Sequence, residues 1–169
     1  MIRHHPEEAL LLDYAAGTAP EAVALAVAVH LAFCSECRAL ARGLESAGGA
    51  LLERLPAAEL APDALDAVFA RIDAEDAGSE AKPEPPADDV PAPLRAYVSG
   101  SLEEQSWRRF GNTDVVFLPV GQDRSWQTSL LRMRPDVRGP RHTHRGIEYT
   151  VVLQGAYFDG IDRYAAGDF

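Results

Sequence analysis

Histidine and cysteine side chains in this chain fall into two small groups, and each group has the spacing of metal ligands. All five histidines and both cysteines belong to one group or the other. Imidazole and thiolate are the side chains that bind zinc and similar ions. The pattern therefore predicts two metal sites. The first group is His4, His5, His30, Cys34 and Cys37, and the second is His142, His144 and Glu148.

The first group contains a run in which His30 precedes Cys34 by four positions and Cys37 by seven. On one continuous helix these three side chains lie within a stripe about 60° wide and can share an ion. Structural zinc takes four ligands, so the fourth must come from elsewhere, and His4 and His5 are the nearest candidates. Four protein ligands leave no open position for water, which predicts a structural role.

Two other interpretations compete with a metal site at the cysteines. A disulfide framework needs more cysteines than two. A redox-active Cys-x-x-Cys motif expects a preceding strand within a β-α-β pattern, whereas this motif lies in a helical pattern. We therefore favour thiolates on a metal, with the redox motif as the alternative.

In the second group, His142 and His144 are two positions apart, so on a strand both side chains face the same side. Glu148 is expected to return on the next strand after a turn at Arg145 and Gly146. Two histidines and a carboxylate suit Zn²⁺, Fe²⁺, Mn²⁺ or Ni²⁺. The alternative is a pair of surface histidines at a strand end. No histidine follows His144 in the sequence.

Composition limits the partners and the compartment. The chain has 169 residues, of which 47% are hydrophobic, and its formal net charge is −10. An acidic chain is a poor binder of nucleic acid, because phosphates repel it, and it is better suited to a basic protein. No apolar run is long enough to span a membrane, and no signal peptide is evident, so we expect a cytoplasmic protein without a membrane partner.

Residues 1–76 are expected to be helical because they are rich in Ala and Leu and poor in β-branched residues. In the last predicted helix, after Asp63, apolar side chains recur at helical spacing at Leu65, Val68, Phe69 and Ile72. The earlier helices are predicted at about residues 6–16, 20–46 and 50–55, with a break at Gly48 and Gly49 between the last two.

The composition changes twice more along the chain. Residues 77–93 are rich in proline and acidic residues, and they are predicted to be an extended linker. Residues 94–169 favour strands, and several short strands in succession indicate a barrel or sandwich. The predicted strands are 107–110, 113–118, 125–131, 147–153 and 156–158.

With these motifs in place, the chain resembles the zinc-binding anti-sigma (ZAS) proteins of the ChrR type, in which a cupin-like domain follows the helical zinc domain. The resemblance rests on an opening His4-His5 pair and on the run from His30 to Arg38. It continues in the His-x-His and Glu148 pattern of a first cupin motif, closed by Gly155. It implies an all-α zinc domain followed by an all-β cupin-like barrel, truncated here before its second motif. That motif would bring a further histidine, so the fourth ligand of the cupin site at His142, His144 and Glu148 is missing from this sequence.

The resemblance also implies ligands and a function. Zn²⁺ would be held by His5, His30, Cys34 and Cys37, with His4 as the weaker alternative to His5. The protein would sequester an extracytoplasmic-function sigma factor by covering surfaces that the factor needs, and would release it on an oxidative signal such as singlet oxygen. It would not be an enzyme, and it would not contact nucleic acid directly.

Two other functions are compatible with parts of this pattern. A metal-dependent cupin oxygenase or isomerase with an accessory zinc domain is the main alternative, since two histidines and a carboxylate can leave positions open for substrate. A DNA-binding regulator would need clustered basic residues near the zinc motif, where only Arg38 and Arg42 are close.

Overall fold

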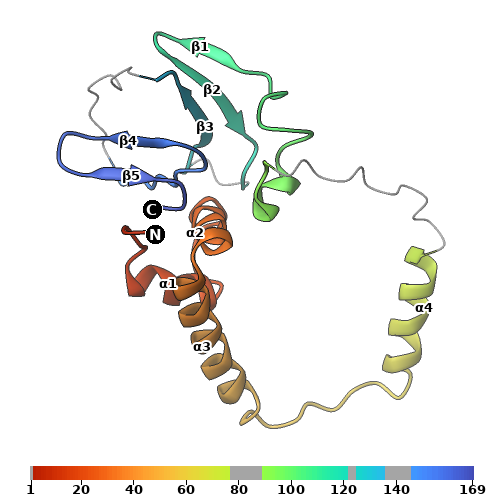
Figure 1. The fold of residues 1–169 in the computed structure, drawn as a ribbon. Helices are drawn as coiled ribbons and strands as arrows, with labels where there is room; N and C mark the ends of the chain where they lie inside the picture. Colours follow the sequence, from red (N-terminus) through yellow and green to blue (C-terminus); the bar gives the residue numbers. More distant parts are fainter. Residues whose placement is uncertain (1, 77–88, 122–124, 136–145) are drawn as a thin grey trace.

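The computed structural model describes residues 2–76, 89–121, 125–135 and 146–169 (Figure 1). Among these residues, helices precede strands, as predicted. The helices are α1 (Glu8–Ala15), α2 (Glu21–Phe33), α3 (Ser35–Leu52), α4 (Ala64–Asp76) and the 3₁₀ helix η1 (Ala92–Ala96). The strands are β1 (Arg108–Phe110), β2 (Thr113–Leu118), β3 (Thr128–Met133), β4 (Ala156–Phe158) and β5 (Arg163–Ala165). No described helix meets the length and hydropathy needed to cross a bilayer.

Helix α2 lies at the centre of the molecule because it is apolar on nearly every side. One side carries Leu25 and Val29, which pack with residues of η1 and of strands β2 and β3. Another side carries Val27 and Leu31, which pack with Leu11 of α1 and with residues of α3. Two hydrophobic clusters therefore meet on one helix, and α2 joins the helical part of the chain to the β part (Figure 1).

The predicted single helix over residues 20–46 is wrong, because the chain breaks at Cys34. That residue has an extended backbone (φ −99°, ψ 107°) and separates α2 from α3. The predicted break at Gly48 and Gly49 is also wrong, since α3 continues through both glycines to Leu52. A glycine costs a helix only about 1 kcal/mol, and at these exposed positions the helix tolerates it.

The β part consists of two small antiparallel sheets, one with the order β1-β2-β3 and one pairing β4 with β5. In the larger sheet Val115 pairs with Leu131 and Val116 pairs with Leu130. Because successive residues of a strand point to opposite faces, these two pairs lie on opposite faces of the sheet. The described strands do not close into a barrel. The predicted strand at 147–153 is wrong, since that segment has no strand ladder, and β5 was not predicted.

The segment 77–88, most of the predicted linker, lies outside the described residues. Just after this segment the chain is packed again: Val90 is only 2% exposed and packs with Leu94 and Val98 in the cluster on α2. In the sequence, the signal for this contact is Val90 itself, a large apolar residue among prolines and acidic residues.

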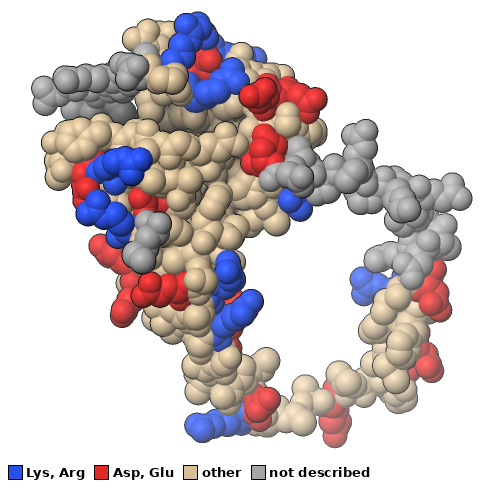
Figure 2. Space-filling view, viewed as in Figure 1, with Lys and Arg blue, Asp and Glu red and all other residues tan. Residues whose placement is uncertain are grey.

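Helix α4 stands apart from the other elements, with open space between them in Figures 1 and 2. The predicted apolar face is present but uncovered. Its four residues are between 49% and 66% exposed, and they are Leu65, Val68, Phe69 and Ile72.

Candidate metal centre

Four side chains of the first predicted group come together in the structure. One ligand atom from each of His5, His30, Cys34 and Cys37 lies within 4.8 Å of the other three. His30 and both cysteines are buried, and His5 is exposed at the edge of the group. The set has the two imidazoles and two sulfurs of a common structural zinc site.

The break at Cys34 positions the two sulfurs. Cys34 is the N-cap of α3, and the backbone N–H of Cys37 donates to Cys34 Sγ at 3.4 Å. An N–H directed at sulfur stabilises the thiolate that a metal needs. His30, Cys34 and Cys37 therefore converge across a kink between α2 and α3. They do not lie along a single helical stripe, as the spacing suggested.

Arg38 fixes the angle of this kink. Its guanidinium reaches back from α3 and donates to the carbonyl oxygens of Leu31 and Ala32, in the last turn of α2. These carbonyls have no partner within their own helix, and a cation is favoured at a helix C-terminus. Arg38 thus joins the end of α2 to the start of α3 beside the ligands.

His30 is completely buried, and its two ring nitrogens have different surroundings. Nδ1 lies 2.7 Å from the carbonyl oxygen of Gly167 and donates to it, which leaves Nε2 as the nitrogen with a free lone pair. Nε2 is buried without a hydrogen-bond partner in the described structure. Burial lowers the pKa of His30, so the ring is neutral and able to ligate.

His5 completes the group from the start of the chain. Its Nδ1 lies 3.2 Å from Cys37 Sγ and 3.5 Å from Cys34 Sγ. A tetrahedral zinc ion with bonds of about 2.0–2.3 Å holds its ligand atoms about 3.3–3.8 Å apart. The spacing of these atoms, together with the partnerless Nε2 of His30, fits such an ion.

Burial raises the pKa of the Cys37 thiol to about 12, and the neighbouring sulfur of Cys34 adds to the rise. Without a cation the thiol is therefore neutral at physiological pH. A metal needs the thiolate, so binding must displace the thiol proton, and the ion supplies the charge that offsets the buried sulfur.

His4, the weaker candidate, lies outside this group. Its ring packs against Tyr164 with the centroids 4.3 Å apart, and its Nε2 lies 3.6 Å from a carboxylate oxygen of Asp162. The side chain of His4 therefore contacts the β part of the chain, whereas the next residue faces the cysteines.

The second predicted group cannot be assembled from the described residues. His142 and His144 lie outside them, and Glu148 is described as an exposed residue. A metal site at these three residues stays a prediction.

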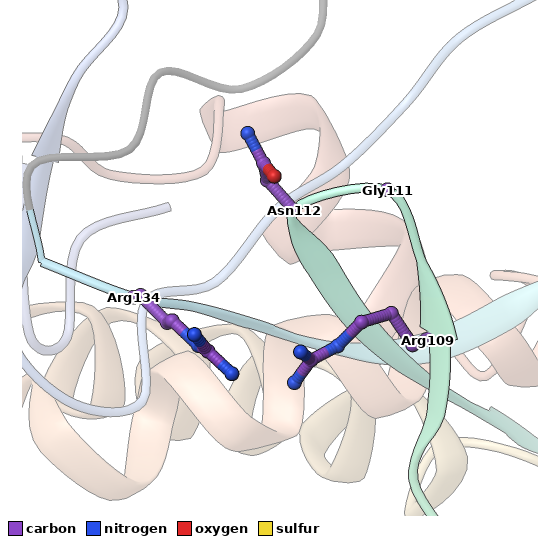
Figure 3. A pocket seen from close by; sticks show the side chains of 4 residues that line it. All are labelled: Arg109, Gly111, Asn112 and Arg134. Carbon is purple, nitrogen blue, oxygen red and sulfur yellow. The ribbon is translucent and has the colours of Figure 1, made fainter.

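A separate cavity of about 120 Å³ lies at the turn between β1 and β2 (Figure 3). Its lining is Arg109, Gly111, Asn112 and Arg134. The Arg109 guanidinium is already paired with Asp114 at 2.8 Å. The part of the lining that the structure describes contains no histidine, cysteine or carboxylate, and it contains none of the predicted ligands.

Sequence reasoning missed three residues around the centre: Arg38, Gly167 and Asp168. Asp168 is 2% exposed, and it accepts hydrogen bonds from the backbone N–H groups of Arg3 and His4. A Gly-Asp pair is a turn signal. Nothing in the sequence reveals that this turn packs against residues more than 160 positions earlier.

The chain is similar to known proteins over nearly its whole length. Residues 96–169 match the family model described as the ChrR cupin-like domain. The chain is 43% identical over 169 residues to the anti-sigma-E factor ChrR of Cereibacter sphaeroides, covering 99% of this chain and 78% of that protein. The crystal structure of Rhodobacter sphaeroides SigE in complex with the anti-sigma ChrR matches with a TM-score of 0.85 and 41% identity. That match covers 99% of this chain and 85% of the other.

Proposed function

The chain belongs to the family of ChrR anti-sigma factors, and from this premise we propose that it binds an extracytoplasmic-function sigma factor and inhibits transcription initiation. The observation that carries the proposal is a likeness over 99% of the chain to a protein solved in complex with its sigma factor. The role is regulatory, so the cupin oxygenase or isomerase interpretation is not retained.

We propose Zn²⁺ as the ion of the N-terminal centre, held by His5, His30, Cys34 and Cys37. Two sulfurs and two imidazoles favour zinc over the hard cations, and the set leaves no open position for chemistry. When bound, the ion cross-links the start of the chain to the kink between α2 and α3. Its contribution is to stability, and it makes residues 1–76 an all-α zinc domain.

We propose that α4 carries part of the surface that binds the sigma factor. Its apolar face is unpartnered among the described residues, although a helix with such a face is stable only when the face is covered. The net charge of −10 suits a basic partner. A helix laid on the sigma factor in this way would exclude polymerase sterically from the surface it covers.

Three finer parts of the function are also proposals. The β part would form a cupin-type barrel with a divalent metal at His142, His144 and Glu148, and this domain would receive an oxidative signal that releases the sigma factor. Thiolates are readily oxidised, which makes such a signal chemically reasonable. The protein would act in the cytoplasm, where its partner and the polymerase are found.

The proposal is tested by mixing the purified, zinc-loaded full chain with SigE of Rhodobacter sphaeroides and with extracytoplasmic-function sigma factors from the same genome as this chain. We expect a one-to-one complex on gel filtration with at least one of them, and loss of transcription in a run-off assay. A folded, zinc-loaded protein that binds none of these factors and leaves transcription unchanged would refute it.

A further inference from the structure

The last residues of the described chain lie directly against the candidate zinc centre. The two termini are adjacent in Figure 1, and the contact joins Gly167, Asp168 and Phe169 to the segment that carries His4 and His5. This contact reaches both histidine ligands, although neither histidine belongs to the β part of the chain.

The first link is the hydrogen bond from His30 Nδ1 to the carbonyl oxygen of Gly167, at 2.7 Å. It is buried, and it selects the tautomer in which Nε2 can bind a metal. Such a partner on the far nitrogen of a ligating histidine orients the ring and raises its basicity. Here that partner is a backbone atom of the β part.

The second link is the carboxylate of Asp168, which holds the backbone leading to His5. Its Oδ1 accepts the N–H of Arg3 at 2.7 Å and the N–H of His4 at 3.1 Å. Its Oδ2 accepts the N–H of Ala165 at 2.8 Å, which fixes the carboxylate within its own turn. In addition, the N–H of Phe169 donates to the carbonyl oxygen of His4 at 3.1 Å.

The third observation is how closely the two segments approach. Gly167 has a φ of +93°, and a β-carbon placed on it would lie 2.7 Å from a methyl carbon of Ile2 and 3.0 Å from Cβ of Phe33. A side chain at this position would force Ile2 and Phe33 to shift, and the positive φ would strain it. The ring of Phe169 also meets the His30 ring edge-on, with centroids 5.8 Å apart.

We propose that the turn formed by Gly167, Asp168 and Phe169 is an outer shell of the zinc centre, and that it positions His5 and His30 as ligands. The inference rests on the proposed zinc site. It makes the zinc affinity of the N-terminal centre depend on the β part of the chain. Because binding linkage is reciprocal, the metal must in turn stabilise the turn against opening.

The first test is the full-length variant Asp168→Ala, with Asp162→Ala as the matched control. Asp162 also lies beside Arg3 and His4, within 3.7 Å and 3.6 Å, but through side chains alone. Competition with a chromogenic chelator, in chains that also carry His142→Ala and His144→Ala, measures the zinc affinity of the cysteine site alone. We expect Asp168→Ala to bind zinc about 10–100-fold more weakly, and Asp162→Ala to change by less than about fivefold, since exposed ion pairs contribute little.

A second measurement separates positioning from general stability. In the Co²⁺-substituted protein, the thiolate-to-cobalt charge-transfer band arises only at the cysteine site. The d–d bands report the ligand geometry. We expect Asp168→Ala to shift these bands while Leu12→Ala, an exposed substitution, leaves them unchanged. In the wild-type chain, hydrogen exchange in peptides covering 165–169 should slow on zinc binding, whereas exchange in β2 and β3 should not.

The outcomes are distinct. A wild-type chain that binds no zinc overturns the proposed site itself. A chain that binds zinc, with Asp168→Ala equal to Asp162→Ala in affinity and spectrum, overturns the outer shell and leaves the site intact. If Asp168→Ala fails to fold, hydrogen exchange of the wild-type chain with and without zinc decides the question. Unchanged exchange at 165–169 on zinc binding then refutes the inference.

Discussion

At the residue scale, the ligand types and their spacing predicted which side chains meet, but not how they meet. His5, His30, Cys34 and Cys37 are together as expected. The reason given, one helical stripe, was wrong because Cys34 caps a new helix. A cysteine sulfur that accepts a backbone N–H acts like a capping oxygen, and this behaviour is not visible in a period of 3.6 residues. The Gly167 and Asp168 contacts were out of reach for a different reason: they join residues more than 130 positions apart.

Removing one sulfur tests the ligand set. In a full chain that also carries His142→Ala and His144→Ala, we expect the wild-type centre to hold one zinc ion and Cys34→Ser to hold none, because a serine hydroxyl is a poor zinc ligand. Zinc content after gel filtration, measured by mass spectrometry, decides this. Ser35→Ala, at the adjacent exposed position, is the control and should retain the ion. Full zinc content in Cys34→Ser would contradict the assignment of this sulfur.

Acid stability depends on Asp168. Burial alone would raise the pKa of its carboxyl, but the backbone N–H groups of Ala165, Arg3 and His4 lower the pKa overall. A pKa below the unfolded value of about 3.9 gives stability that is complete above about pH 5 and is lost as the pH falls. We expect the free energy of unfolding of the metal-free chain to fall more steeply over this range in wild type than in Asp168→Asn. Urea titrations with a chelator present measure it, and parallel pH profiles would contradict it.

At the scale of the element, periodicity and composition predicted α1, α4, β1, β2 and β4 close to their observed bounds. They failed at 147–153, where an apolar run was assigned to a strand. That segment is held instead by two isolated backbone bonds, from Val152 to Asp168 and from Gly167 to Val152. β-branched residues suit buried positions as well as strands. Composition alone therefore could not distinguish a strand from a buried segment without a strand ladder. Strand β5 has only three residues and carries little pattern.

Helix α1 offers a matched pair of adjacent leucines. Leu11 is 1% exposed and packs against α2 and α3, while Leu12 is 53% exposed. We expect Leu11→Ala to lower the free energy of unfolding by about 2–4 kcal/mol, because it leaves a cavity beside the cysteines. Leu12→Ala should change it by less than about 0.5 kcal/mol. Chemical denaturation of the zinc-loaded chains compares them, and equal losses would contradict the placement of α1.

At the scale of the whole molecule, composition predicted a helical half followed by a β half. It did not predict that the two halves pack against each other. Leu25 and Val29 of α2 share one hydrophobic cluster with Val90, Leu94 and Leu130. An apolar run such as Ala22 to Phe33 shows that a helix is buried, without showing what covers each side. The exposed face of α4 is the reverse case, since its period was read correctly and none of the described residues covers it.

That face gives a prediction for the complex. We expect Phe69→Asp combined with Ile72→Asp to weaken binding to the sigma factor by more than about tenfold, because losing an apolar anchor costs about 2 kcal/mol or more. Zinc content and thermal stability should stay unchanged, since both residues are about half exposed and pack on neither hydrophobic cluster. Ala67→Asp, on the opposite face of α4, is the control. Calorimetric titration measures the affinity, and equal affinities would contradict the docking role of the face.

The contact between residues 2–5 and 165–169 also sets an order of events during synthesis. All four candidate ligands have been translated by Cys37, whereas the carbonyl that orients His30 belongs to Gly167. At about 5–20 residues per second, the ribosome needs roughly 6–26 s to cover that interval. A nascent chain therefore has every donor atom well before it has the turn that aligns them, so the ligands are fully oriented only once residues 165–169 have emerged.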